Sequence, residues 1–516
     1  MVVVDWGTVV ALSPLFQALD GGSGRTGGVD VLKAVGSRSR MAPATGPLRV
    51  HPANPRYFTD GNGQAIYLTG SHMHDNLVDH STRPTFDYPA YLDFLERYNH
   101  SFIRMWTWEH ARVSQPANTW LDFSPLPYQR TGPGNALDGK PKFDLTKFNQ
   151  AYFDRLRARV MGARDRGIYV SVMLFEGWSV NGFDRHKPVF RAWYGHPFNI
   201  NNNINGVDGD PERNERGDEV HTLKIPSVTR LQLAYIRKVV DTLNDLDNVL
   251  YEIANECPRD SEDWQYSMIN YIHAHERHKP TQHPVVMTFL WDGPGHSTNG
   301  SNAELFRSPA EAISPGQGRN GEYRDNPSPA DGSKVVLSDT DHLWGYGGNS
   351  GWVWKSFVRG CNPIYMTADN PGEHQEAEAE EVRRAMGFTR IYADKVNLAR
   401  MLPRCDLAST EYCLANPGRE YLIYLPSDPY WIENRFRGRT GYWRLEWLFR
   451  KFRELFKLTV TVDLSAASGK LGAEWFNPST GNVLSGGTTT GGAKQTFKAP
   501  FRRDAVLYLA SREMPT

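Results

Sequence analysis

Between about residues 48 and 402, short runs of apolar residues alternate with segments whose apolar residues recur every third or fourth position. Phe148, Tyr152, Leu156 and Val160 follow helical spacing, Gly167 interrupts the pattern, and residues 168–175 form a continuous apolar run. This order is typical of one helix followed by one buried strand.

The same order recurs along this part of the chain. It predicts helices over 91–98, 148–160, 228–243, 268–275 and 382–402, and strands over 66–69, 102–106, 168–175, 249–254, 285–290, 312–314, 335–338 and 364–367. The pattern at 312–314 is the weakest of the eight. Continuous apolar strands between helices indicate a parallel sheet covered on both faces, and eight of them predict a closed (β/α)8 TIM barrel. The fold class is therefore α/β.

Two changes in composition and residue pattern divide the chain into three predicted parts. Residues 21–46 are rich in Gly, Ser, Arg and Ala without apolar periodicity, so residues 1–46 are predicted to be a disordered leader or linker. The barrel is expected over 47–402. Short strands with turn signals follow, which predicts a small all-β sandwich domain over 403–516.

One segment of the C-terminal part differs from its surroundings. Residues 443–457 place apolar side chains at helical spacing, with basic side chains opposite. We expect a helix that packs on the barrel; a contact with a protein or a membrane surface is the alternative.

The charge balance limits the partners that this protein attracts. The chain has 58 Lys and Arg against 58 Asp and Glu, so it lacks the field that draws proteins to nucleic acid or anionic membranes. No apolar run is long enough for a membrane span. Its 15 Trp residues suit stacking against sugar rings, and filling a large core is the alternative use.

No motif calls for a cofactor or a metal. There is no CxxC zinc spacing, and no glycine-rich phosphate loop follows a predicted strand. We expect a carbohydrate substrate, no cofactor and no metal, and no pattern sets the oligomeric state.

Polar and aromatic side chains gather where the predicted strands end. Barrel enzymes place their active sites at the carboxyl ends of the strands. The candidates there are His72 and His74 after the first strand; Arg104, Trp106, Trp108 and Glu109 in and after the second; Glu176 and Trp178 after the third; Asn255 and Glu256 after the fourth; Trp291 after the fifth; and Asp339, Asp341, His342 and Trp344 after the seventh.

The fourth strand and its end, residues 249–256 (VLYEIANE), carry a resemblance. They resemble the Asn-Glu signature of the large clan of barrel glycoside hydrolases. The resemblance implies that Glu256 is the catalytic acid/base and that Asn255 binds the sugar 2-hydroxyl. Arg104 matches the second-strand Arg that supports the catalytic carboxylates in that clan.

Other segments narrow the resemblance. Residues 54–60 (NPRYFTD), 68–72 (LTGSH) and 196–206, which begin with His196, look like the apiosidase-like barrel family, and His196 is a further candidate substrate-binding residue. Residues 475–481 (WFNPSTG) are similar to the β-sandwich family that carries a collagen-binding label, to which we attach no function.

The seventh strand departs from the clan pattern. The clan places a Glu nucleophile at its end, whereas residues 335–342 (VVLSDTDH) contain no Glu. Asp339 or Asp341 is the predicted partner of Glu256, with Asp339 slightly favoured by strand length. Because Asp is shorter than Glu, the clan's retaining mechanism need not carry over and inversion stays open, although Asn255 and Arg104 favour retention.

The remaining candidates have alternatives. His72 and His74 are expected to bind substrate hydroxyls, the alternative being a metal site with Asp341 and His342. Glu109 and Glu176 either bind sugar or form a solvated rim. Two or three of the five Trp residues are expected to be stacking platforms.

The predicted function is hydrolysis of O-glycosidic bonds in plant or microbial polysaccharides or oligosaccharides by a two-carboxylate mechanism. The alternative is a carbohydrate-binding pseudoenzyme that lost the seventh-strand Glu. No motif in the sequence supports a peptidase function. We expect an extracellular or periplasmic location, although residues 1–20 lack the positive region of a signal peptide.

Overall fold

The computed structural model describes residues 41–114, 119–181, 191–293, 299–317, 321–367, 376–427 and 458–511. At its centre lies a sheet of eight parallel strands. They are β3 (Gly70–His72), β5 (Phe102–Met105), β10 (Tyr169–Glu176), β11 (Val249–Asn255), β12 (Val285–Thr288), β13 (Ala312–Ser314), β14 (Val335–Asp339) and β15 (Asn362–Met366).

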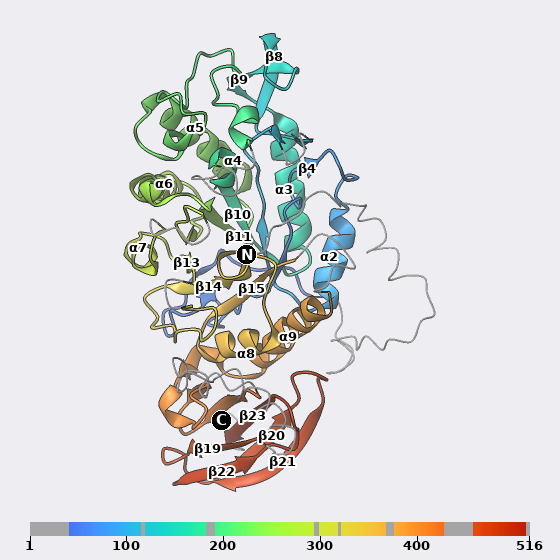
Figure 1. The fold of residues 1–516 in the computed structure, drawn as a ribbon. Coiled ribbons are helices and arrows are strands. Elements are labelled where there is room, and N and C mark those ends of the chain that lie inside the picture. Colours follow the sequence, from blue (N-terminus) through green and yellow to red (C-terminus); the bar gives the residue numbers. More distant parts are fainter. Residues whose placement is uncertain are drawn as a thin grey trace, which may run out of the picture.

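The order of these strands is that of a TIM barrel. Their hydrogen-bonded order is β3-β15-β14-β13-β12-β11-β10-β5, and the two end strands, β3 and β5, also contact one another. Gly70 allows this contact, because a Cβ on it would lie 2.1 Å from the carbonyl oxygen of Phe102. The predicted fold class, a (β/α)8 barrel followed by a β domain, is confirmed (Figure 1).

Helices surround the barrel, and their apolar faces are buried against it. They are α2 (Tyr88–Arg97), α3 (Gln150–Arg164), α5 (Pro226–Leu243), α6 (Glu262–Glu276), α7 (Asn302–Arg307), α8 (Ser350–Val358) and α9 (Glu376–Lys395), with a short α4 (Trp178–Asn181). The last helix ends at Lys395 and not near residue 402, so that part of the prediction is wrong. The backbone after Lys395 forms hydrogen bonds with the C-terminal domain. The Asn397 amide donates to Glu420 (3.1 Å), and Leu402 pairs with Ala415.

The first barrel strand is also displaced from its predicted position. Residues 66–69 were expected to form it, but Ile66 makes an antiparallel bridge with Phe58 on β2 (Phe58–Thr59), which pairs with β1 (Arg49–Val50). The barrel strand itself begins at Gly70. As a result His72 lies inside the strand and not in the loop that follows it.

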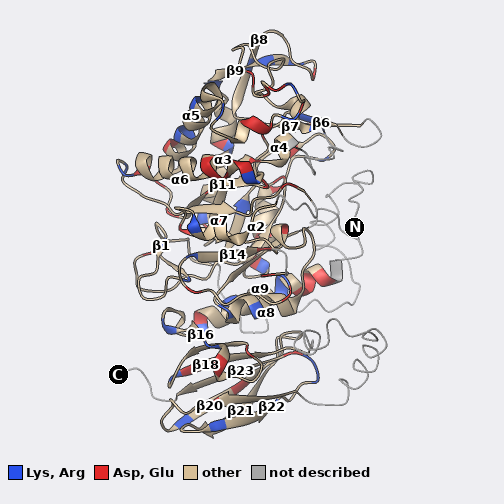
Figure 2. Ribbon diagram, turned by 60° about the vertical axis from the view of Figure 1, so that its left-hand side comes forward, with Lys and Arg blue, Asp and Glu red and all other residues tan. Residues whose placement is uncertain are grey.

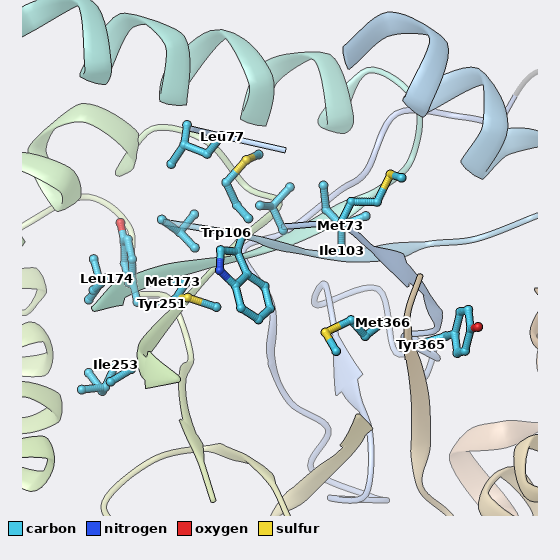
Figure 3. Close-up of a cluster of buried hydrophobic side chains, with 14 of the residues drawn as sticks. Met73, Leu77, Ile103, Trp106, Met173, Leu174, Tyr251, Ile253, Tyr365 and Met366 are labelled. Atoms are coloured by element: carbon cyan, nitrogen blue, oxygen red, sulfur yellow. The ribbon is translucent and has the colours of Figure 1, made fainter. Parts of the chain in front are cut away.

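The barrel interior is layered. Side chains from several strands, including Phe102 and Leu250, fill its amino-terminal end. Two residues farther along the same strands, and so on the same face, come Arg104 and Glu252. A polar layer therefore lies directly on an apolar one. Figure 3 shows part of the larger apolar cluster outside this layer, with Ile103 on β5 among its members.

The C-terminal region forms two antiparallel sheets around their own apolar core. The larger sheet has the order β16-β17-β18-β23-β20-β21. Its strands are β16 (Leu402–Pro403), β17 (Cys413–Asn416), β18 (Glu420–Leu425), β20 (Lys470–Phe476), β21 (Val483–Thr490) and β23 (Ala505–Ser511), and the smaller sheet pairs β19 (Thr459–Asp463) with β22 (Lys494–Lys498).

An aromatic contact joins the two domains. α8 and α9 lie between the barrel strands and the C-terminal sheets (Figure 1). Phe476 on β20 packs on Trp354 of α8 and on Phe388 and Tyr392 of α9, with ring centroids 5.1–5.6 Å apart. The predicted helix at 443–457 and the leader up to residue 40 lie outside the described residues.

Long excursions after the first and second barrel strands carry β structure of their own. A three-stranded sheet has the order β4-β7-β6, and a hairpin pairs β8 with β9. These strands are β4 (Asp79–His80), β6 (Arg112–Ser114), β7 (Trp120–Ser124), β8 (Tyr128–Asn135) and β9 (Pro141–Phe148).

Figure 2 shows basic and acidic residues interspersed over the barrel and the C-terminal sheets. None of the helices in the described ranges has the length and apolar character of a membrane span.

Candidate active site

Arg104 is the centre of a buried ionic network in the barrel. Its Nε donates to Oε2 of Glu252 at 2.9 Å, and its two terminal nitrogens reach three further side chains. One donates to Asp339 (3.0 Å) and Asp341 (2.9 Å), and the other to Oδ1 of Asn255 (2.7 Å). The planar guanidinium of this β5 residue thus holds groups from β11, from the end of β14 and from the segment after it in fixed positions.

Asp339 is enclosed by this network. Its carboxylate contacts His72 Nε2 at 2.9–3.0 Å and Arg104, and it accepts the Asp341 amide at 3.0 Å. The side chain is fully buried. Burial alone would raise the pKa of Asp339, but the positive charges of His72 and Arg104 hold it below its ordinary value. Asp339 is therefore a buried carboxylate with three hydrogen-bond donors around it.

Asp341 lies beyond the strand, in the short 3-10 helix η6 (Thr340–His342). Besides Arg104, its carboxylate lies 3.7 Å from His342 Nε2, and its side chain keeps 6% of its surface exposed. His342 bridges two strands, contacting Asn255 Oδ1 at 2.9 Å and the Ser314 hydroxyl at 2.8 Å. Burial lowers the pKa of His342.

Glu256 directly follows β11 and is partly exposed. Its φ of 47° is in the left-handed region, which non-glycine residues adopt rarely. The backbone at Gly177 passes close to the backbone of Glu256, because a Cβ on Gly177 would lie 2.2 Å from the Glu256 carbonyl oxygen. Burial, and next the nearby Asp341 carboxylate, raise the pKa of Glu256 well above its ordinary value.

Glu176, at the end of β10, is a third carboxyl group beside these two. It is buried, and Asn255 Nδ2 lies 3.4–3.5 Å from its oxygens. Burial, followed by the charge of Glu256, raises its pKa well above the ordinary value. The sequence left open whether Glu176 lies on a solvated rim; the structure places it inside the wall of the site.

Glu109 is likewise mostly buried, with 12% of its side chain exposed. Its carboxylate contacts Nε2 of His221 at 2.9 Å and Nε2 of His196 at 3.5 Å, and it accepts the Glu176 amide at 2.8 Å. Although burial opposes this, the charge of His221 and the hydrogen bond from His196 lower the pKa of Glu109 to about 2. Glu109 therefore anchors the chain that carries Glu176.

The predicted stacking residues fall into two groups. Trp106 and Trp108 are buried, and Trp106 lies parallel to the His72 ring at 5.6 Å. Trp178, Trp291 and Trp344 are partly exposed. His74 packs edge-on against Trp106 at 4.6 Å and contacts the Tyr346 hydroxyl at 3.1 Å.

The histidines do not converge on one point. His72 contacts Asp339, His74 contacts Tyr346, and His342 contacts Asn255. In the part of the chain that the structure describes, no group of three or more His, Cys, Asp or Glu side chains has the arrangement of a metal site.

Three residues of this site were missed in the sequence analysis. Glu252 is a charged residue inside an apolar strand, and a buried charge needs a partner, so its position was a usable signal. His221 ends a short 3-10 helix (Asp218–His221) and Tyr346 lies in a loop, and neither segment is long enough for periodicity to mark the direction of a side chain. Only the folded chain brings them to Glu109 and His74.

The comparisons with known proteins concern the fold. The family model described as a domain of unknown function (DUF6298) matches residues 105–289. A search of curated protein sequences finds no match. A solved structure described as a glycoside hydrolase is 12% identical, with a TM-score of 0.53 over 92% of this chain and 99% of that one. A glycoside hydrolase family 5 structure from Bacteroides vulgatus is also 12% identical, with a TM-score of 0.54 over 92% and 95%.

At this identity the likeness shows the fold: a TIM barrel with a C-terminal β domain, as found in solved glycoside hydrolases.

Proposed function

We propose that this protein is a glycoside hydrolase in which Glu256 protonates the leaving glycosidic oxygen and Asp341 is the second carboxylate. The observation that carries the proposal is the pair itself. Glu256, a partly exposed carboxyl with a raised pKa, lies close enough to the Arg104-bound Asp341 to be affected by its charge. Two carboxyl groups in different electrostatic environments are what acid-assisted cleavage of a glycosidic bond requires.

Asp341 replaces Asp339 as the favoured partner. Asp339 has no exposed surface, and its oxygens are bound to His72, Arg104 and the Asp341 amide. A carboxylate so enclosed offers no exposed surface to an anomeric carbon or a water. Asp341 retains some exposure, and its carboxylate contacts Arg104 at 2.9 Å and His342 Nε2 at 3.7 Å. Asp339 then acts as a positioning residue that fixes Arg104 and the peptide of Asp341.

The substrate that suits this site is a neutral sugar chain in a plant or microbial polysaccharide or oligosaccharide. Asn255 and His342 offer hydrogen-bonding groups next to Glu256 and Asp341, and Trp178, Trp291 and Trp344 keep partly exposed aromatic surface. Extracellular or periplasmic placement of the protein goes with such a substrate and is part of the proposal.

A carbohydrate-binding pseudoenzyme is the second candidate, favoured by the absence of a Glu at the end of β14. Activity on aryl glycosides and polysaccharides distinguishes the two. Glu256→Gln keeps the side-chain shape but has no transferable proton, so turnover of a substrate with a poor leaving group should fall about 100- to 10,000-fold. Near wild-type turnover by Glu256→Gln would refute the assignment.

Asp341→Asn and Asp339→Asn form a matched pair for the second carboxylate. Asp341→Asn should fold normally and lose activity by about 100-fold or more. Asp339→Asn should mainly lower stability, because it breaks a fully buried ion pair. Full activity in Asp341→Asn would show that Asp341 is not the second carboxylate, and Glu176 would be the next residue to test. The anomeric configuration of the first product, followed by NMR, separates nucleophilic attack by Asp341, with retention, from activation of a water, with inversion.

A further inference from the structure

The outer face of the small β4-β7-β6 sheet carries an exposed tryptophan. Along β7, Leu121 and Phe123 are buried, whereas Trp120 and Asp122 alternate with them on the outer face. Trp120 is 40% exposed, the only Trp among the exposed large apolar side chains of the described residues. A single exposed apolar residue is ordinary, so its surroundings decide what it means.

The indole ring of Trp120 is held in place. The Tyr194 ring packs against it with centroids 4.7 Å apart, and the Arg112 guanidinium lies 5.9 Å from its centroid. Tyr194 is itself fixed, because its hydroxyl donates to the carbonyl oxygen of Leu137 at 2.7 Å. A ligand that stacks on Trp120 therefore meets a ring that is already oriented, which lowers the entropy cost of binding.

Polar side chains surround the exposed ring. Asp122 accepts hydrogen bonds from Arg112 and from Lys140 Nζ (3.0 Å), and all three side chains keep a quarter or more of their surface exposed. The group combines a flat apolar surface with charged donors and an acceptor at its edge. Such a combination fits a pyranose ring, whose face carries C–H groups and whose rim carries hydroxyls.

The same element connects this surface to the candidate active site. β6 begins three residues after Glu109, and its last residue, Ser114, pairs with Trp120. Five residues of extended chain span at most about 17 Å. On the inner face Phe123 packs on Trp108 at 5.3 Å, and Trp108 packs on Trp178 at 5.5 Å. Figure 2 shows β6 and β7 beside α4, the short helix that begins at Trp178.

We propose that Trp120, Tyr194 and the Arg112–Asp122–Lys140 group form a second sugar-binding platform, which stacks on a pyranose unit of a polysaccharide several units away from Glu256. This inference rests on the proposed function and extends it. The platform gives the protein a reason to prefer long chains over short oligosaccharides. A sugar chain that spans from Glu256 to Trp120 gains contacts that a disaccharide cannot make.

Binding measured apart from catalysis tests the platform. Glu256→Gln is titrated by affinity gel electrophoresis with the pyranose polymers β-mannan, xylan and β-glucan. The same is done after adding Trp120→Ala, Trp120→Tyr or the control Val483→Ala, which truncates a 48% exposed residue of the C-terminal domain. Trp120→Ala should weaken binding to at least one polymer about tenfold, since one stacked ring contributes that much. Trp120→Tyr should retain most of the binding, and Val483→Ala should retain all of it.

Three outcomes would overturn the proposal. Binding that is equal with and without Trp120→Ala would show that the ring is not used, and absence of binding to every polymer would show that no platform exists for them. A concentration-dependent dimer that Trp120→Ala abolishes would assign the surface to a second copy of the chain. Failure of the proposed function is separate, because it appears as near wild-type turnover by Glu256→Gln of a substrate with a poor leaving group.

Discussion

Arg104 and Glu252 form a buried ion pair across the barrel interior, although their strands β5 and β11 are separated in the sheet by β10. Both side chains are almost fully enclosed. Arg104 carries the contacts to Asp339, Asp341 and Asn255, so Glu252 orients the group on which the candidate site depends.

Removing Glu252 should therefore destabilise the protein. Glu252→Ala leaves the Arg104 charge buried with one partner fewer, and breaking a buried pair costs about 3–5 kcal/mol. Asp245→Ala is the control, because it breaks the exposed Arg157–Asp245 pair and should cost no more than about 1 kcal/mol. Urea unfolding followed by circular dichroism measures both. Equal losses for the two variants would contradict the central role of Glu252.

The backbone crossing at Gly177 gives a prediction about activity. In Gly177→Ala the new Cβ meets the Glu256 carbonyl oxygen at 2.2 Å, so the Glu256 peptide must move. We expect glycosidase activity to fall about 100-fold, since small misplacements of a catalytic group are costly. Gly162→Ala on α3 is the control, because its nearest contact would be at 3.4 Å, and it should keep full activity. If both variants are equally active, Gly177 does not position Glu256.

The raised pKa of Glu256 predicts the alkaline side of the pH profile. A general acid works only while protonated, so kcat/KM should fall as the pH rises through this pKa, which lies above the ordinary value for Glu. Glu256→Gln should lose that alkaline limb on a substrate with an activated leaving group, which needs no proton. An identical limb in the variant would assign it to another residue, with Glu176 the first to examine.

Glu109 predicts a pH dependence of stability. Its pKa is about 2 in the folded protein, below the ordinary value of about 4.3. A lowered folded-state pKa stabilises the fold above the unfolded-state value, and this contribution disappears as the pH falls from about 4.3 towards 2. The free energy of unfolding, measured in urea across this range, should drop less steeply in Glu109→Gln than in the wild type. Parallel curves would show that His221 and His196 do not stabilise the Glu109 carboxylate.

Local pattern was enough to predict the barrel. Alternation of helical patterns and apolar runs predicted all eight strands, including the short one at Ala312–Ser314. The prediction succeeds because each pattern of apolar residues reflects a face of a helix or strand that must be buried. The first strand and the end of the last helix were misplaced. In both cases a strand outside the predicted element pairs with the backbone: Phe58 bridges Ile66, and Ala415 pairs with Leu402.

The sequence by itself determined that polar residues collect at the strand ends and that Glu256 follows a buried strand. Only the tertiary structure decided which carboxylates are enclosed and which keep exposed surface. Asp339 and Asp341 are two residues apart, and the pattern favoured Asp339 slightly, yet Asp339 is enclosed between His72 and Arg104 while Asp341 keeps some exposure close to Glu256. The reason is physical: periodicity records which side of an element is buried, whereas ion pairing and pKa depend on which strands meet across the barrel.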